Sequence, residues 1–327
     1  MDLMLNFNAP KADKEINHRH KILSVGSCFT EHIGNALKDL KFSVLQNPNG
    51  ILFDPVSVCQ SLTSYIYQQQ YSEKDFFQLN ELWHSWQHHS RFSHTDLSTA
   101  VQNINQSQTE AHQFLKEADW LIITLGSSFS YRLVNHSFAP VANCHRAPAQ
   151  WFKKHLLGID EMIAGLDNAI HQVFHFNPKV NIIFTISPVR HIRDGVIENN
   201  RSKARLVEVV HHLVNKFNRL YYFPSYEIVI DVLRDYRFYD IDMVHPNYLA
   251  TEYVLQQFMQ AYMSSETIAL NKELKSISIA RRHRSAHPQT KANQKFLESQ
   301  LQKVGQLQQQ HPYLDLADEA AYFSGKN

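Results

Sequence analysis

Two short stretches of the sequence, far apart in the chain, carry side chains that could act together as a nucleophile and its base. Ser27 and Cys28 lie in SVGSCFT, which follows a short apolar run and precedes a segment with helical spacing. Asp242 and His245 lie three residues apart in YDIDMVHPN. A serine hydroxyl attacks a carbonyl when a histidine takes its proton and a carboxylate orients that histidine. These residue types therefore predict acyl-transfer chemistry. The alternative is a pair of purely structural turns.

The Gly-Ser-Cys turn offers two nucleophiles. Gly26 lets the chain turn sharply, and the following helix is expected to begin near Thr30, a good N-cap residue. The free N–H groups of that helix would favour negative charge near Ser27. Cys28 is the alternative nucleophile, because a thiol is intrinsically more nucleophilic and a helix N-terminus lowers its pKa. Neighbouring side chains on such a turn point in different directions, so only one of the two can face His245.

The elements that must position these residues follow from hydrophobic periodicity. Near-continuous apolar runs, typical of strands buried on both faces, occur at residues 21–25, 42–45, 120–125, 180–186 and 220–223. Stretches with helical spacing follow or separate them at residues 33–40, 151–176, 206–217 and 249–262. This alternation predicts an α/β fold with a parallel sheet, whose ligands bind outside the carboxyl ends of the strands. The Ser27 turn closes the first strand.

Residues 55–116 form a stretch that is longer than a single crossover between strands needs. It holds two polar helical segments, at residues 56–69 and 96–117, on either side of LWHSWQHHSRFSH. We expect a helical insertion that covers part of the site, and a buried position for Trp83 and Trp86 is the alternative. The histidines of this piece come without HExxH or flanking carboxylates, so we expect no metal there.

A polar helical extension, residues 264–327, is expected after a domain of residues 1–263. Its segment ARRHRSAHPQTKANQK carries five Arg or Lys and no acidic residue. Over the whole chain 32 basic residues face 31 acidic ones, which gives no electrostatic reason to expect nucleic acid. A solvated helical face is therefore the expected role of the basic segment, with RNA binding as the alternative. The extension would pack on the core or on a partner, and in the second case form a homo-oligomer through these helices.

The rest of the composition bears on location and cofactors. The first 21 residues lack a long apolar core, and no run approaches the roughly 18 to 20 apolar residues of a membrane span. Three scattered cysteines without CxxC spacing argue against a disulfide framework and a thiolate zinc site. We expect a soluble cytoplasmic protein with reduced thiols, no metal or organic cofactor, and no membrane partner.

Several ordered blocks of the sequence resemble the GSCFA domain family, which is itself similar to SGNH (GDSL-like) hydrolases. The blocks are GSCF, SPVRHIRDG followed by NRSKA, and the late DxxHPN, and they cover about residues 20–260. Thr30 stands where the alanine of the family name would be. The resemblance implies a flavodoxin-like three-layer α/β/α sandwich of about five parallel strands. It also implies Ser27 as the nucleophile and His245 with Asp242 as the relay.

The resemblance also implies an oxyanion hole, made in SGNH enzymes by the serine N–H, a glycine N–H and an asparagine side chain. Ser27 and Gly50 match the first two donors. After the third strand, however, GSS puts Ser128 where the asparagine is expected. A hydroxyl has shorter reach than an amide, and losing one such donor can cost about 10²- to 10³-fold in rate.

Three further residues are candidates for binding the substrate. Arg190 and His191 follow the fourth strand, and Arg146 lies in NCHRAP. An arginine beside an acyl-transfer site can bind a carboxylate or phosphate, although each of these residues could instead belong to a structural ion pair. The sequence thus predicts a serine-dependent ester hydrolase or acyltransferase acting on a small-molecule or carbohydrate ester. A non-catalytic carbohydrate- or ligand-binding protein on the same fold is the alternative.

Overall fold

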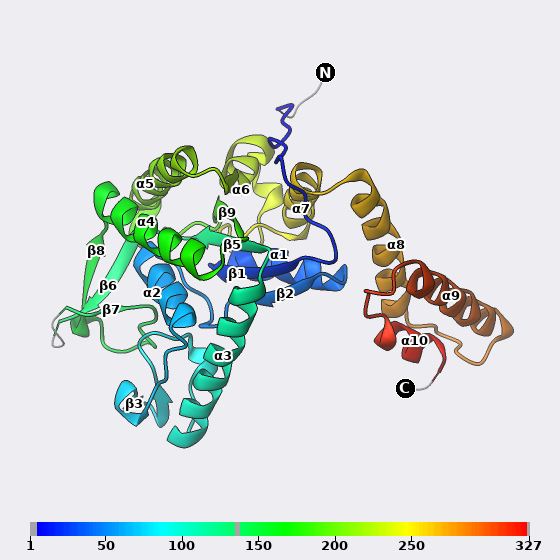
Figure 1. The fold of residues 1–327 in the computed structure, drawn as a ribbon, viewed down its shortest axis with the longest axis horizontal. Coiled ribbons are helices and arrows are strands. Elements are labelled where there is room, and N and C mark those ends of the chain that lie inside the picture. The colour runs from blue at the N-terminus through cyan, green and yellow to red at the C-terminus, as the bar shows by residue number, and fades with distance from the viewer. Residues whose placement is uncertain (1–4, 135–137, 326–327) are drawn as a thin grey trace.

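A parallel five-stranded sheet forms the centre of the protein, whose computed structural model describes residues 5–134 and 138–325 (Figure 1). The spatial order of the strands is β10-β9-β5-β1-β2. Their bounds are β1 (Lys21–Gly26), β2 (Ser43–Gln46), β5 (Trp120–Leu125), β9 (Asn181–Ile186) and β10 (Leu220–Phe223). The chain therefore begins with β1, adds β2 on one side of it, and then adds β5, β9 and β10 in turn on the other side. This is the flavodoxin-like order. The predicted parallel sheet and its strands are confirmed.

Helices cover both faces of this sheet. The α-helices in the described ranges are α1 (Cys28–Asp39), α2 (Pro55–Ile66), α3 (Leu97–Glu117), α4 (Ile159–Phe176), α5 (Gly195–Lys216), α6 (Ser225–Glu227), α7 (Tyr248–Tyr262), α8 (Ser265–Arg282), α9 (Lys291–Gln310) and α10 (Ala317–Phe323). Side chains of α1, α7 and α8 pack on one face of the sheet, and those of α2, α3, α4 and α5 pack on the other. The predicted three-layer α/β/α sandwich is confirmed.

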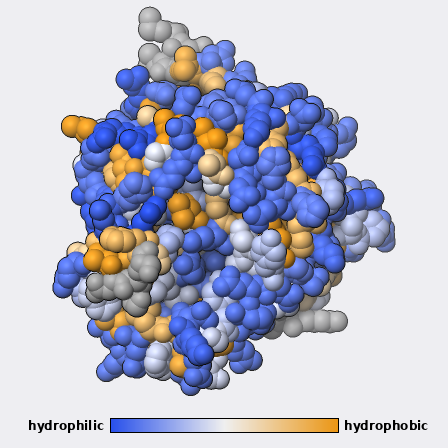
Figure 2. All heavy atoms as spheres, turned by 60° about the vertical axis from the view of Figure 1, so that its left-hand side comes forward, coloured by the Kyte–Doolittle hydropathy of each residue, from blue (hydrophilic) through white to orange (hydrophobic). Residues whose placement is uncertain are grey.

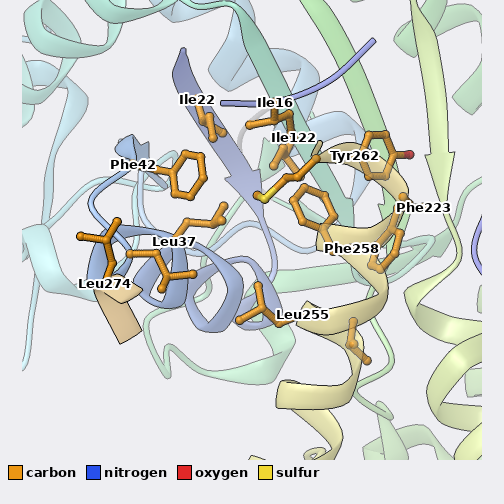
Figure 3. Close-up of a cluster of buried hydrophobic side chains, with 14 of the residues drawn as sticks. Ile16, Ile22, Leu37, Phe42, Ile122, Phe223, Leu255, Phe258, Tyr262 and Leu274 are labelled. Atoms are coloured by element: carbon orange, nitrogen blue, oxygen red, sulfur yellow. The ribbon is translucent and has the colours of Figure 1, made fainter. Parts of the chain in front are cut away.

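Strand residues alternate between the two faces, as the pleat requires. Ile22 and Ile122 point to the α1 and α7 side, where they meet Leu37 and Phe258 (Figure 3). Their neighbours in sequence belong to the cluster under α2, α4 and α5. Because both faces are buried, the strands read as continuous apolar runs, which is why the sequence located them so well.

Two small antiparallel sheets lie outside the central one. One is the hairpin of β3 (Phe77–Leu79) and β4 (Leu82–His84), and the other has the order β7 (Pro140–Val141), β6 (Phe129–Leu133), β8 (Phe152–Leu156). The helix predicted over residues 151–176 is therefore wrong in its first part. Phe152–Leu156 pairs with β6 along its whole length, and α4 begins only after the N-cap residue Gly158. Pairing with a distant strand overrides the local helical spacing.

The C-terminal helices pack on the α1 side of the sheet. Leu274 and Ile277 of α8, Val304 and Leu307 of α9, and Phe323 of α10 belong to the same buried cluster as the sheet residues. In Figure 1 these helices lie at the opposite end of the molecule from α4 and α5. On the face shown in Figure 2, hydrophilic side chains predominate and the apolar residues form small separate patches. None of the helices in the described ranges is long and apolar enough to cross a membrane.

Candidate active site

The Ser27 turn lies at the carboxyl end of β1, next to the end of β5. Between these two strands the order in which the chain adds strands changes from one side of β1 to the other, and open α/β sheets bind their ligands at such a switch point. Ser27 itself is the N-cap residue of α1, with φ −68° and ψ 172°. The predicted helix start near Thr30 is wrong, because the chain turns already at Gly26. Gly26 has φ +142°, a conformation that side chains rarely adopt, and this allows the helix to begin directly at Cys28.

The hydroxyl of Ser27 is buried but has no hydrogen-bond partner among the described residues. The residue is 1% exposed, and its Oγ makes no hydrogen bond to any residue in the described ranges. Its backbone N–H, in contrast, donates to the Thr124 carbonyl at 3.1 Å. A buried hydroxyl without a partner is costly, and a catalytic role is one explanation for such a group. The side chain is thus available to a base, whereas the N–H is held by β5.

Asn47, which was not among the predicted site residues, fixes the turn from the β2 side. Its Oδ1 accepts the Gly26 N–H at 2.9 Å, and its own N–H donates to the Ser24 carbonyl at 2.8 Å. Asn47 is completely buried and has a left-handed backbone with φ +47°. The available signal was the NPNG sequence after the second strand, because asparagine tolerates this conformation better than most residues.

Gly50 closes the same loop. Its φ of +81° and the nearby His89, whose Cγ would lie 3.0 Å from an added Cβ, leave room only for glycine. The Gly50 N–H donates to the Asn47 carbonyl at 2.7 Å. As it stands, this N–H stabilises its own loop.

Asp242 and His245 form a directly hydrogen-bonded pair. Asp242 Oδ2 lies 2.6 Å from His245 Nδ1, and Asp242 Oδ1 accepts the backbone N–H groups of Val244 at 2.9 Å and His245 at 3.0 Å. The His245 backbone N–H, the His245 ring and the Val244 N–H lower the pKa of Asp242 to about 2. The carboxylate is therefore ionised at neutral pH and can hold the imidazole with Nδ1 protonated. Nε2 is then the nitrogen that can accept a proton.

The loop that carries this pair is docked at the carboxyl end of β9. The Arg190 N–H donates to the Val244 carbonyl at 3.4 Å, and the Arg190 guanidinium lies 4.4 Å from the centre of the Tyr239 ring. Arg190 thus stabilises the loop through a cation–π contact instead of an ion pair. Because β9, β5 and β1 are successive strands, the Asp242–His245 pair and Ser27 belong to the same edge of the sheet. Among the described residues, however, no hydrogen bond joins His245 to Ser27.

His191 and Arg146, the other two predicted substrate-side residues, have different surroundings. His191 is partly buried, and its ring packs edge-on against Phe53 with 5.5 Å between centroids. Burial, aided by the charge of Lys203, lowers the pKa of His191 to about 4, so the imidazole is neutral. Its Nε2 has no hydrogen-bond partner within the described ranges. Arg146 is exposed and makes no ion pair among these residues.

Ser128 faces α5. Its N–H donates to Ser202 Oγ at 2.8 Å, and its hydroxyl donates to the Ser202 carbonyl at 3.1 Å. The residue is fully buried. The three predicted oxyanion donors are therefore not gathered as a free set: Ser27 N–H, Gly50 N–H and Ser128 Oγ each already have a protein acceptor.

Lys203, adjacent to Ser202 on α5, is the most unusual group at this edge. It is 1% exposed, and its Nζ donates to the carbonyls of Gly126 and Ser187, both at 2.6 Å. Burial lowers the pKa of Lys203 to about 7. In the sequence, Lys203 belongs to the NRSKA block, for which no role was predicted. Its spacing offered a signal, since Lys203 occupies the same stripe of α5 as the buried Leu206 and Val210.

The alternative nucleophile, Cys28, is partly buried. Burial raises the pKa of its thiol, against the opposing effect of the helix N–H groups. At neutral pH the thiol is therefore protonated and a weak nucleophile. This favours Ser27 within the turn.

The aromatic and histidine-rich piece forms its own small cluster. Phe77 and Trp86 stack with 3.5 Å between ring centroids, and His84 contacts His145 at 4.5 Å. His84 is hydrogen-bonded to Ser93 Oγ and the Leu79 carbonyl. No cluster of His, Cys, Asp or Glu in the described part of the chain could hold a metal ion. These histidines are partners in packing and hydrogen bonding.

Comparison with known proteins relates this chain to a family of sequences. The model of the GSCFA family matches residues 21–258, and that of the GSCFA domain protein, C-terminal domain, matches residues 274–326. No curated protein matches. Among solved structures, a family 3 carbohydrate esterase from Clostridium thermocellum aligns with 11% identity and a TM-score of 0.36 over 78% of this chain and 98% of its own. One from Talaromyces cellulolyticus aligns with 10% identity and a TM-score of 0.36 over 78% and 99%.

Proposed function

Because the chain belongs to the GSCFA family and carries its serine turn and its late Asp-His motif at one sheet edge, we propose that it is a serine-dependent ester hydrolase or acyltransferase. The observation that carries the proposal is the Asp242–His245 pair, joined at 2.6 Å and anchored to the end of β9. Ser27, two strands away, has a buried hydroxyl that is without a partner among the described residues. The substrate class we propose is a small-molecule or carbohydrate ester.

The reaction proceeds in two halves. Ser27 Oγ forms a bond to the acyl carbon while its proton passes to His245 Nε2, and the resulting imidazolium then protonates the leaving-group oxygen as the ester bond breaks. Water or an acceptor hydroxyl attacks the acyl-enzyme, and His245 again takes the proton. Asp242 stays ionised throughout, because its pKa of about 2 is far below neutral pH.

The geometry requires one rearrangement before chemistry. Ser27 is 1% exposed, and it must meet both substrate and His245 Nε2. The side chains of His245 and Asp242 are 41% and 46% exposed, so neither is locked by packing. Rotation or closure of this loop toward the Ser27 turn would complete the hydrogen bond. Catalytic hydrogen bonds often tighten only with substrate bound.

A serine-reactive fluorophosphonate probe and short-chain aryl esters test the proposal. We expect the wild type to label and turn over ester, Ser27→Ala and His245→Ala to lose both, and Cys28→Ser to keep both. Labelling that survives in Ser27→Ala would refute Ser27 as the nucleophile. Labelling lost only in Cys28→Ser would assign the chemistry to the thiol.

A non-catalytic carbohydrate- or ligand-binding protein is the second candidate. One specific observation favours it: all three predicted oxyanion donors are engaged within the protein. On this alternative, the wild type would bind carbohydrate, as measured by calorimetry, yet neither label nor hydrolyse any ester. Ser27→Ala would then leave binding unchanged.

A further inference from the structure

Lys203 brings a positive charge into the edge of the sheet that carries the Ser27 turn. Its Nζ bridges the carbonyl of Gly126, at the end of β5, and that of Ser187, at the end of β9, at 2.6 Å each. Two residues before Gly126, the Thr124 carbonyl accepts the N–H of Ser27. The ammonium and the candidate nucleophile are therefore bound by carbonyls that lie only two residues apart in the chain.

The same contacts reach the loop of the candidate base. Ser187 is followed after three residues by Arg190, whose N–H and guanidinium hold the Asp242–His245 loop. By joining the ends of β5 and β9, Lys203 fixes the two segments from which Ser27 and His245 are positioned. Hydrogen bonds from a charged donor are about twice as strong as neutral ones, so the ammonium holds this geometry better than a neutral amine.

Among the described residues, no carboxylate neutralises the charge of Lys203. Within the described ranges it has no ion-pair partner, and the groups that face it are the thiol of Cys28 from α1, the neutral imidazole of His191, and the ring of Tyr226 in α6, 5.8 Å from Nζ. A buried cation without a counter-charge is energetically costly and is most stable when a negative charge forms nearby. The tetrahedral intermediate at Ser27 would carry such a charge.

We propose that Lys203 is a positioning residue of the Ser27 site, a role that presupposes the proposed function. Its ammonium fixes the ends of β5 and β9 and provides the uncompensated positive charge that favours the oxyanion, in place of the asparagine that is absent at Ser128. The protonated lysine is the active form. Lys203 needs no contact with the substrate for this role.

The alkaline side of the pH dependence of activity follows from the proton on Lys203. The pKa of Lys203 is lowered to about 7, so the ammonium is present below this pH and is lost above it. The groups that face it titrate elsewhere: burial lowers the pKa of His191 to about 4 and raises those of Cys28 and Tyr226 above their ordinary values. Activity should therefore fall as pH rises through about 7.

The test is the pH profile, from pH 5 to 9, of kcat/KM for an aryl ester and of the fluorophosphonate labelling rate. The variants are Lys203→Met, which keeps the length and removes the charge, and Lys203→Arg, which keeps the charge at all these pH values. Lys216→Met, on the same helix at an exposed position, is the matched control. Circular-dichroism melts establish that each variant is folded.

We expect Lys203→Met to lose about 10²-fold in rate at pH 6 and to lack the alkaline decline, so that its profile meets that of the wild type near pH 9. Lys203→Arg should retain activity above pH 7, and Lys216→Met should match the wild type. If Lys203→Met does not fold, the wild-type and Lys203→Arg profiles still decide.

Two results in an active wild type would overturn the inference alone. One is a rate that does not decline between pH 6 and 9. The other is a rate that rises through pH 7 and loses this rise in Lys203→Met, since the neutral amine would then be the active form. An absence of any Ser27-dependent activity at every pH would instead refute the proposed function, and the role of Lys203 with it.

Discussion

Gly26→Ala is the sharpest test of the geometry that holds Ser27. The added Cβ would lie 2.8 Å from the carbonyl carbon of Thr124 and closer still to its oxygen, so β1 and β5 would have to separate. The backbone at Gly26 also has φ +142°, where a side chain is strained. Backbone strain of this kind costs about 1–3 kcal/mol, and overpacking of a rigid site costs a similar amount. We expect the free energy of unfolding to fall by about 4 kcal/mol.

The matched control is Gly305→Ala. Gly305 lies in α9, and no atom of the described residues lies within 4 Å of an added Cβ. Replacing an exposed helical glycine by alanine should raise the free energy of unfolding by about 0.5–1 kcal/mol. The same substitution should therefore change the free energy of unfolding in opposite directions at the two sites.

Urea unfolding, followed by circular dichroism, measures both effects. Labelling of Ser27 by the fluorophosphonate probe provides the functional readout, and a displacement of about 1 Å at the nucleophile should slow it about 10²-fold or more. If Gly26→Ala unfolds within about 1 kcal/mol of the wild type and labels at the wild-type rate, the close approach of β1 and β5 does not constrain the turn.

Three further substitutions probe the surroundings of the site. Asp242→Asn should slow labelling by about 10²- to 10⁴-fold, because the imidazole of His245 loses its orienting carboxylate. Since the pKa of Asp242 is lowered to about 2, the stability that its ionised form contributes is present above about pH 4 and lost as pH falls through 2; acid titration of the wild type against this variant should show a relative loss in that window. Arg190→Met removes the guanidinium from the Tyr239 ring and should speed hydrogen exchange of residues 240–247, at a cost of about 0.5–1 kcal/mol. Ser202→Ala should destabilise the protein by about 1–3 kcal/mol in urea, because the buried N–H that Ser202 Oγ accepts loses its partner.

The strands and the Asp242–His245 hydrogen bond could be predicted from the sequence because each is a local pattern. Residues 120–125 are six consecutive apolar or β-branched positions buried on both faces, and the predicted run matches β5. The Asp242–His245 pair is equally local, since a three-residue spacing lets the carboxylate reach both backbone N–H groups and the ring. Both features depend on neighbours within a few positions, and this made them predictable.

The contacts that hold the site are of another kind. Asn47 reaches Gly26 across 21 positions, Ser202 reaches Ser128 across 74, and Lys203 reaches Gly126 across 77. Hydrophobic periodicity does not predict such hydrogen bonds, because each depends on the order of the strands in the sheet. The same limit explains β8, whose partner β6 lies 19 or more positions earlier at every pairing.

The surroundings of Ser128 explain why a serine occupies this position. Ser128 is fully buried, and both its N–H and its hydroxyl are taken up by Ser202 on α5. An asparagine side chain there would have to enter the space that Ser202 fills, so the absent amide reflects how α5 packs against the end of β5. The next residue of α5 is Lys203, whose ammonium binds the carbonyl two positions before Ser128. In the proposed mechanism, one turn of α5 thus replaces the amide dipole of an asparagine with a full charge. That charge acts at longer range and is lost near pH 7, so the activity of an enzyme of this design should decline as pH rises through about 7.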